Sequence, residues 1–259
     1  MKSSQKQILD KKLIADSFRA SGSTYEENAA VQKKISRQLV KLLKDIDSIN
    51  YSRVLEIGCC TGILTDSLVG IGPINKIYLN DIVEEFCSIS AERIGGRVDQ
   101  LELLPGDIEK CLLPVELSLV VSSATLQWMV NLPALLEKIH GSLSCGGYLV
   151  FSLFGPGTMQ EISSLTGRSL HYNSSQELRD MLTAHFQLVS IKSDSHKLYF
   201  QSVREVLQHI RQTGVGGLGR SKWLPGRFKE FERQYRSRYV SDKGLPLSYA
   251  STFVVARKK

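Results

Sequence analysis

The sequence lacks any apolar stretch long enough to cross a membrane. No run approaches the roughly 18 residues that a transmembrane helix needs. The polar N-terminal residues Met1–Lys6 are not followed by an apolar segment like that of a secretory signal. We therefore expect a cytoplasmic protein that has no membrane partner.

Cysteine is scarce, and its spacing fits neither a disulfide framework nor a zinc site. The five cysteines are an odd number, and none of them has CxxC or CxxH spacing. The five histidines also share no metal-ligand spacing, and no Ser-His-Asp or Cys-His arrangement is visible. We expect reduced thiols and no metal site, and the sequence shows no such arrangement that would supply a general base.

The length and composition are those of an ordinary globular α/β protein. The chain has 259 residues, of which 42% are hydrophobic and 23% are charged. Short apolar runs alternate with helical patterns between residues 53 and 155, which indicates βαβ units and a parallel sheet. The predicted strands are Arg53–Ile57, Lys76–Asn80, Leu101–Leu104, Leu117–Val121 and Tyr148–Phe154, and the predicted helices are Gly62–Val69, Glu84–Arg93 and Leu132–Leu143.

The two ends of the chain have a different pattern. Two further strands, Phe186–Ser193 and Ser251–Ala256, are separated by two predicted helices, Ser202–Thr213 and Pro225–Tyr239. The first ~48 residues look helical, with a predicted break near Ser21–Ser23, where Gly22 lies. We expect a single domain made of a helical flap (1–50), a cofactor-binding core (51–200), a helical cap insert (201–245) and a last strand (246–259).

The first predicted strand runs into a glycine loop with the sequence VLEIGCCTG, Val54–Gly62. The dinucleotide fingerprint GxGxxG fails here, because Cys60 and Ile63 stand at its second and third glycine positions. The GxxxxGK[ST] pattern fails too, because no lysine follows. Since both phosphate-binding patterns fail, a nicotinamide oxidoreductase is disfavoured, and a ligand with a ribose and an adenine but no phosphate fits better.

Acidic residues lie at the ends of three successive strands. Glu56 precedes the glycine loop, Asp81 ends the second strand, and Asp107 follows the third. Asp81 can accept both ribose hydroxyls, and Asp107 can accept from an adenine amino group while Ile108 packs on the ring. These carboxylates also suit the positive sulfonium and ammonium groups of S-adenosylmethionine. Taken singly, Asp81 and Asp107 could each be an ordinary turn or cap residue.

The chain resembles the class I S-adenosylmethionine-dependent methyltransferases over residues 53–154, through VLEIGCCTG, LNDI, PGDIE, VVSSATLQW and LSCGGYLVFSLF. The resemblance implies a Rossmann-like, seven-stranded, mostly parallel sheet with helices on both faces, and S-adenosylhomocysteine as the product. The cofactor-binding residues that it implies are Glu56, Gly58, Cys59, Gly62, Asp81, Ile82, Asp107, Ile108 and Ser123. Cys60 departs from the family, which usually has glycine at this position.

A closer resemblance extends over nearly the whole chain. Tyr25 with Gln32 and the segments SSATLQWMVNLPALL, FSLFGPGTMQEI, RQTGVGG and LPLSYASTFVVARK are similar to the malonyl-[acyl-carrier protein] O-methyltransferases of biotin synthesis. This resemblance implies methylation of the free carboxyl of a malonyl thioester carried by an acyl carrier protein. A related methyltransferase of another small acid, a quinone precursor or a nucleic acid stays open, as does a cofactor-binding subunit without turnover.

Methyl transfer to a carboxylate needs no general base, because the acceptor is already ionised near neutral pH. Catalysis is then expected from alignment and from exclusion of water. We expect the flap and the insert to cover the site. Tyr25 is a candidate catalytic residue that reaches the cofactor or the substrate carboxylate from the flap, and Trp128 is a second candidate that walls the substrate pocket.

The net charge of +7 is concentrated in one segment. Residues 220–238 hold two acids and seven basic side chains, which are Arg220, Lys222, Arg227, Lys229, Arg233, Arg236 and Arg238. A solvated helix is the simplest interpretation, and the alternative is a docking surface for the acidic malonyl-loaded carrier protein. No basic groove interleaved with aromatic residues is visible, so no nucleic-acid partner is expected.

Overall fold

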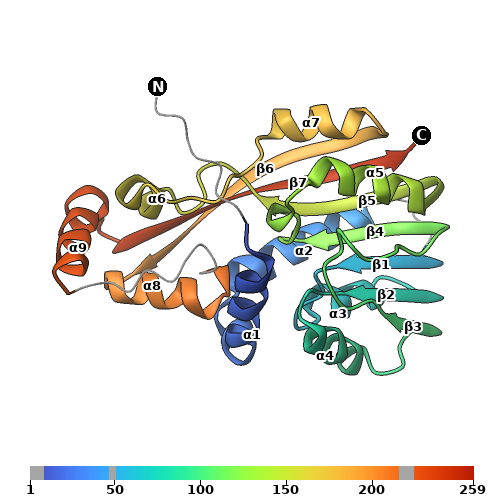
Figure 1. Cartoon of the computed structure of the whole chain (residues 1–259), viewed down its shortest axis with the longest axis horizontal. Helices are drawn as coiled ribbons and strands as arrows, with labels where there is room; N and C mark the ends of the chain where they lie inside the picture. The colour runs from blue at the N-terminus through green and yellow to red at the C-terminus, as the bar shows by residue number, and fades with distance from the viewer. Residues whose placement is uncertain (1–8, 47–50, 216–224) are drawn as a thin grey trace.

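The computed structural model describes residues 9–46, 51–215 and 225–259, and it contains a seven-stranded sheet with helices on both faces (Figure 1). The strands are β1 (Arg53–Ile57), β2 (Lys76–Asn80), β3 (Gln100–Leu103), β4 (Leu117–Ser123), β5 (Leu143–Phe154), β6 (Phe186–Phe200) and β7 (Leu245–Lys258). The helices are α1 (Lys11–Asn28), α2 (Ala30–Lys44), α3 (Ile63–Val69), α4 (Glu84–Ile94), η1 (Leu126–Trp128), α5 (Leu132–Ser142), α6 (Gln160–Thr166), α7 (Ser175–Thr183), α8 (Val203–Gln212) and α9 (Pro225–Tyr239).

The strand order is β3-β2-β1-β4-β5-β7-β6, and β1 to β5 are parallel. Only β7 reverses direction, pairing antiparallel with both β5 and β6. In register, Ile57 lies between Asn80 and Ser122. The carboxyl ends of β1, β2 and β4 therefore meet at one edge of the sheet, where ligands bind in open α/β folds. The predicted Rossmann-like, mostly parallel sheet is confirmed.

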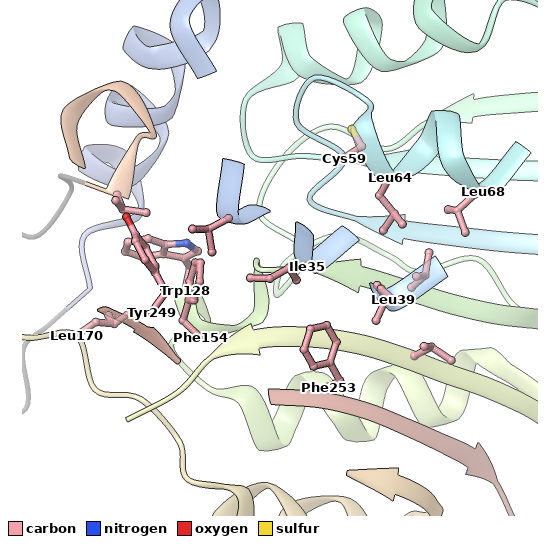
Figure 2. Close-up of a cluster of buried hydrophobic side chains, with 14 of the residues drawn as sticks. Ile35, Leu39, Cys59, Leu64, Leu68, Trp128, Phe154, Leu170, Tyr249 and Phe253 are labelled. Carbon is pink, nitrogen blue, oxygen red and sulfur yellow. The ribbon is translucent and has the colours of Figure 1, made fainter. Parts of the chain in front are cut away.

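Two apolar layers enclose the sheet, because successive residues of its central strands point to opposite faces. On one face Val54 packs with α2 and α3, through Ile35, Leu39, Leu64 and Leu68 (Figure 2). On the other face, Leu55 and Ile57 pack with α5 and α7. Among the described residues, no helix is both long and apolar enough to cross a membrane.

The predicted break near Ser21–Ser23 is wrong. Helix α1 continues through these residues to Asn28, and the φ of −82° and ψ of 42° of its C-cap residue Ala29 leave the helical region. Gly22 instead permits close packing, because a Cβ there would lie 3.0 Å from the ring of Phe86 on α4. The neighbouring Ser21 is also buried. Gly22 therefore marks a close contact between the flap and the core.

Strands β6 and β7 are longer than predicted and pair as far as Phe200 and Leu245. They extend well past the central strands, and α8 and α9 lie near this extended end (Figure 1). Helix α8 packs on α1, whereas α9 packs on α6 and β7. The insert touches the flap through α8 and through Gly214, whose carbonyl accepts a hydrogen bond from the Ser17 hydroxyl at 3.0 Å. Among the described residues, neither insert helix lines the main cavity at the strand ends.

Candidate functional site

A cavity of about 650 Å³, including its open mouth, lies at the carboxyl ends of the parallel strands. Its floor is formed by the glycine loop and by the residues after β2, β3 and β4, and its roof by Lys11, Ile14, Phe18 and Tyr25 of α1. The flap thus covers the edge at which the sequence places the three acids.

The glycine loop has a conformation that explains its composition. Gly58 has a φ of +76°, and a Cβ there would lie 2.1 Å from the hydroxyl oxygen of Thr125. Cys60 also has a positive φ, +49°, which is unfavourable for a residue with a side chain. Its backbone N–H donates to Asp81 Oδ2 at 2.9 Å. This bond ties the loop to the end of β2.

Asp81 is buried and receives backbone hydrogen bonds at both carboxylate oxygens. Besides Cys60, Val83 donates its N–H to Oδ1 at 2.9 Å. Burial raises the pKa of Asp81 to about 6, although these backbone bonds act in the opposite direction. Each oxygen keeps a second lone pair, so the carboxylate can still accept from a ligand hydroxyl.

Glu56 is 1% exposed, and neither of its carboxylate oxygens has a hydrogen-bond partner. Burial raises its pKa to about 8, and the Asp81 carboxylate adds to the rise. The Thr65 hydroxyl is near enough to lower the pKa somewhat but does not lie in hydrogen-bond geometry. An unpaired buried carboxyl is costly, so this position is suited to a cationic ligand group.

Further unpaired polar atoms surround a smaller cavity of about 330 Å³ beside Glu56. The two cavities share Tyr25, Gly58, Cys60 and Ser123 as walls, so they adjoin. Buried polar atoms without a partner in this smaller cavity are Gln32 Oε1, Ser36 Oγ, both Glu56 oxygens and Thr61 Oγ1. Since buried polar atoms are normally hydrogen-bonded, this cluster indicates a polar, charged ligand group.

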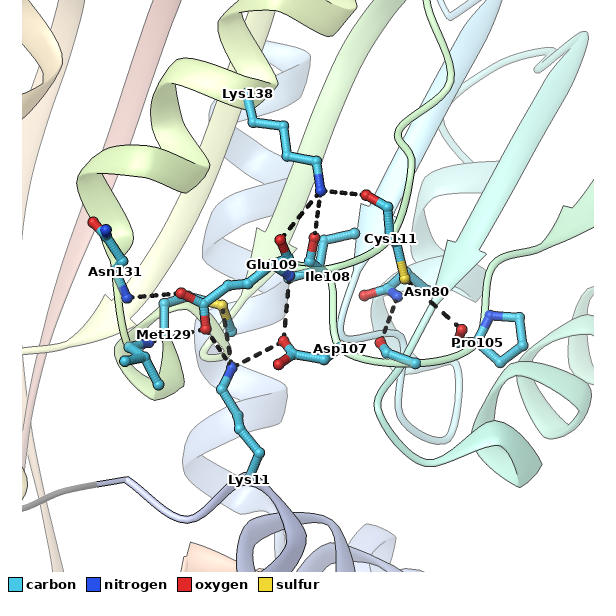
Figure 3. Close-up of polar contacts among 12 residues, drawn as sticks. Lys11, Asn80, Pro105, Asp107, Ile108, Glu109, Cys111, Met129, Asn131 and Lys138 are labelled. Carbon is cyan, nitrogen blue, oxygen red and sulfur yellow. Dashed lines mark hydrogen bonds and ion pairs between the residues drawn. The ribbon is translucent and has the colours of Figure 1, made fainter.

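The loop after β3 is held rigidly at the opposite side of the main cavity. The Asn80 amide donates to the carbonyls of Leu104 at 2.7 Å and Gly106 at 3.0 Å. Lys138 of α5 donates to the carbonyls of Ile108, Glu109 and Cys111 (Figure 3). Asp107 and Ile108 therefore line the cavity on a fixed backbone.

The flap tyrosine meets the glycine loop directly. The Tyr25 hydroxyl lies beside the Cys60 thiol, and burial raises the pKa of both groups. Tyr25 is therefore neutral at physiological pH and can donate a hydrogen bond but cannot act as a base.

Trp128 lies on the far wall of the main cavity, after β4. It is 6% exposed, and its ring contacts Phe18 of the flap edge-on at 5.8 Å between centroids. Around it the side chains of Phe154, Leu170 and Tyr249 form an apolar layer (Figure 2). Its indole N–H has no hydrogen-bond partner, which leaves one buried donor at this wall.

The sequence relatives of this chain carry methyltransferase names. Residues 55–151 match the family described as a methyltransferase domain. A malonyl-[acyl-carrier protein] O-methyltransferase of Chlorobium phaeovibrioides is 37% identical, with 97% of this chain and 98% of the relative covered. One of Acinetobacter baylyi is 35% identical, with 96% and 98% covered. This chain belongs to the malonyl-[acyl-carrier protein] O-methyltransferase family. It is therefore a methyltransferase.

Solved structures show the same fold at low sequence identity. The YcgJ protein of Bacillus subtilis superposes with a TM-score of 0.60 at 12% identity, over 86% of this chain and 99% of that one. The N-methyltransferase NodS of Bradyrhizobium japonicum, solved with S-adenosylhomocysteine, gives 0.51 at 15% identity, over 91% and 98%. The fold is thus shared with proteins whose sequences have diverged widely.

The structure brings nearly all of the predicted site residues of this family member together. The main cavity is lined by Tyr25, Gly58, Asp81, Ile82, Asp107, Ile108, Ser123 and Trp128, and the smaller one by Glu56 and Cys59. Gly62 lines neither of these cavities. It lies behind the loop, where a Cβ would be 2.9 Å from Arg93 Cδ and 3.1 Å from Ser90 Cα. The function of each residue stays a prediction.

Sequence reasoning missed several cavity residues that come from helices distant in the chain. Lys11 and Phe18 reach the site from α1, and Ser36 from α2. Thr125, which packs on Gly58, follows β4 without a distinctive motif. The amphipathic pattern predicts the helices but does not show which turn faces the strand ends.

The basic segment is only partly described, since Arg220 and Lys222 lie outside the described residues. On α9, the buried Phe231 and Tyr235 face the protein. Two of the exposed basic residues form ion pairs within the helix. Arg233 Nη2 lies 2.6 Å from Glu230 Oε1, and Arg236 Nε lies 3.8 Å from Glu232 Oε1. Among the described residues, three exposed cations of α9 make no ion pair, namely Arg227, Lys229 and Arg238.

Proposed function

We propose that the two adjoining cavities bind S-adenosylmethionine and release S-adenosylhomocysteine. The observation that carries this proposal is the unpaired, buried Glu56 carboxyl in a cluster of unpaired polar atoms. The amino acid part of the cofactor supplies an ammonium for Glu56 and a carboxylate for hydroxyl donors such as Ser36 and Thr61. NodS, a fold neighbour, was solved with S-adenosylhomocysteine.

The remaining assignments follow from position. Asp81, at the end of β2, would accept from the ribose hydroxyls. Asp107 would accept from the adenine amino group, with Ile108 and Ile82 packing on the ring. Gly58, Cys59 and Ser123 would lie along the cofactor where the glycine loop meets β4. The absence of a phosphate-binding motif agrees with a cofactor that has no phosphate.

We propose that the methyl acceptor is the free carboxyl of a malonyl group carried on an acyl carrier protein. Relatives that match over nearly the full length bear this activity in their names. The ionised carboxylate attacks the methyl carbon, the carbon–sulfur bond breaks, and sulfur takes the electron pair, so no proton moves. Opposite charges cancel in this step, which favours a cavity roofed against water by α1.

Trp128 would hold the acceptor rather than the cofactor. Its unpaired indole N–H is a buried donor that an acceptor oxygen would satisfy. Phe18 and Met129 supply apolar surface beside it. Tyr25 would act by hydrogen bonding, because burial keeps it neutral. Both residues orient the reactants in this proposal, and neither takes a proton.

The direct test is transfer of a labelled methyl group. Incubation with labelled S-adenosylmethionine and malonyl-loaded carrier protein should give a base-labile methyl ester on the carrier. A butyryl-loaded carrier, which has no free carboxyl, should remain unlabelled. Cofactor binding without labelling of the malonyl carrier would reject this acceptor, and malonyl-coenzyme A in parallel shows whether the carrier is required.

We further propose that α9 docks the acidic carrier through its unpaired cations. Reversing Arg227, Lys229 and Arg238 to glutamate should raise KM for the carrier substrate at least ~10-fold, mainly through slower association. The matched control is Arg179→Glu on α7, another exposed cation, which should leave KM unchanged. Equal KM values for the triple variant, the control and the parent protein would reject docking at α9.

A further inference from the structure

One carboxylate connects the flap with both sides of the cavity. Lys11, the first residue of α1, places its ammonium 2.7 Å from Glu109 Oε2 and 3.1 Å from Asp107 Oδ1 (Figure 3). These three side chains are only 14–20% exposed. The ion pairs join residues about 100 positions apart in the chain, so they fix the N-terminal turn of the flap over the loop after β3.

The same Glu109 side chain also holds the loop that follows Trp128. The backbone N–H of Asn131 donates to Oε1 at 2.7 Å, and that of Val130 donates to Oε2 at 3.0 Å. Burial alone would raise the pKa of Glu109, but Lys11 and these two N–H groups lower it below its ordinary value. Glu109 is therefore a permanent anion that meets the flap, the loop of Asp107 and the acceptor-side loop.

We propose that Glu109 is a positioning residue that keeps α1 closed over the bound cofactor through Lys11. The inference rests on the proposed cofactor site. Lys11 and the Glu109 backbone N–H both contact Asp107 Oδ1, which leaves Oδ2 to accept from the adenine amino group. If the ligand weakens the contact between Lys11 and Asp107, Glu109 retains the ammonium and the flap stays in place.

A second lysine holds the loop after β3 independently, so the role of Glu109 and Lys11 can be tested while this loop stays folded. Lys138 binds three backbone carbonyls of the same loop from its other side (Figure 3). These bonds do not involve Lys11, so removal of the Lys11 ammonium should leave the loop folded. Glu109 does not line either cavity, so its effect on a ligand must pass through Lys11 or the loops.

The experiment compares Lys11→Met, Glu109→Gln and the double variant. The matched control is Lys12→Met, because Lys12 is exposed and makes no ion pair among the described residues. Dissociation of S-adenosylhomocysteine is measured by stopped flow. We expect each single variant to release the ligand about tenfold faster, and the double variant to be no faster than the singles, which is the signature of two coupled residues.

Hydrogen exchange of the amides in residues 11–18 provides a readout that does not depend on the ligand. These amides should exchange faster in Lys11→Met and Glu109→Gln than in the parent protein or in Lys12→Met. Unchanged exchange, dissociation rates within twofold of the parent, or fully additive effects would overturn the inference. If the parent fails to bind S-adenosylhomocysteine, the cofactor proposal fails, and exchange alone then decides whether the ion pair holds the flap.

Discussion

Replacing Glu56 by glutamine should stabilise the cofactor-free protein and weaken cofactor binding at the same time. Glu56 is 1% exposed and unpaired, and its pKa rises from 4.5 to about 8. The folded protein thus binds a proton that the unfolded chain gives up between these pH values. The free energy of unfolding falls as pH rises through this window, which is opposite to the usual behaviour of a paired carboxylate.

The size of the effect follows from the pKa shift. At pH 7 the wild-type protein should be less stable by about 3 kcal/mol than it would be with Glu56 neutral in both states, since each pKa unit corresponds to about 1.36 kcal/mol. Glutamine has the same shape and no charge, so Glu56→Gln should remove this penalty. The advantage of the variant should be near zero at pH 4.5 and should grow up to pH 8.

Urea denaturation of both proteins at several pH values between 4.5 and 8 measures this difference. Asp81, with a pKa of about 6, adds a pH dependence to both proteins, so the comparison isolates the part that needs the Glu56 carboxyl, including its repulsion with Asp81. Stability curves that run parallel would refute the reasoning, as would a variant less stable than the parent at pH 7. Affinity for S-adenosylhomocysteine should fall at least ~10-fold, because the ammonium loses its charged partner.

Three further substitutions test other parts of the site. Gly58→Ala should destabilise the protein by roughly 2–4 kcal/mol in urea denaturation, because it adds left-handed strain and a clash with Thr125. The control Gly72→Ala, at a position in open space, should cost less than ~1 kcal/mol. Equal losses of stability in the two variants would contradict the clash. Trp128→Phe should raise KM for the malonyl carrier about tenfold without changing cofactor affinity in calorimetry; a cofactor defect alone would place Trp128 elsewhere. Tyr25→Phe should lower kcat by less than ~100-fold and leave the pH profile unchanged, whereas a lost basic limb in the profile would indicate proton transfer.

The sequence predicts the buried parallel strands best. Both β1 and β2 have the predicted bounds, because each is a short apolar run ended by a glycine or an aspartate. The second half of β6 is not predicted, since exposed polar residues such as Ser195 and Lys197 alternate there with half-buried ones. Pairing with β7 holds this segment in the sheet, and sequence periodicity does not show such long-range pairing.

The same limit applies to the site. The three acids could be placed at one edge because carboxyl ends of parallel strands converge. The sequence does not place Lys11, Gln32 and Ser36 at this edge, because their contribution depends on how α1 and α2 pack across the strand ends. Outside the site, the sequence does carry a start signal for α7, because Ser174 and Glu177 form a capping box there.

Calorimetry of S-adenosylhomocysteine binding at pH 7, in two buffers with different ionisation enthalpies, tests the proposed cofactor site most directly. A group with a pKa of about 8 is about nine-tenths protonated at pH 7, and pairing with the ligand ammonium should expel that proton. We predict binding at one site per chain with release of nearly one proton, and no release by Glu56→Gln. Absence of binding, or equal proton release by both proteins, would contradict the assignment of the unpaired carboxyl to the cofactor.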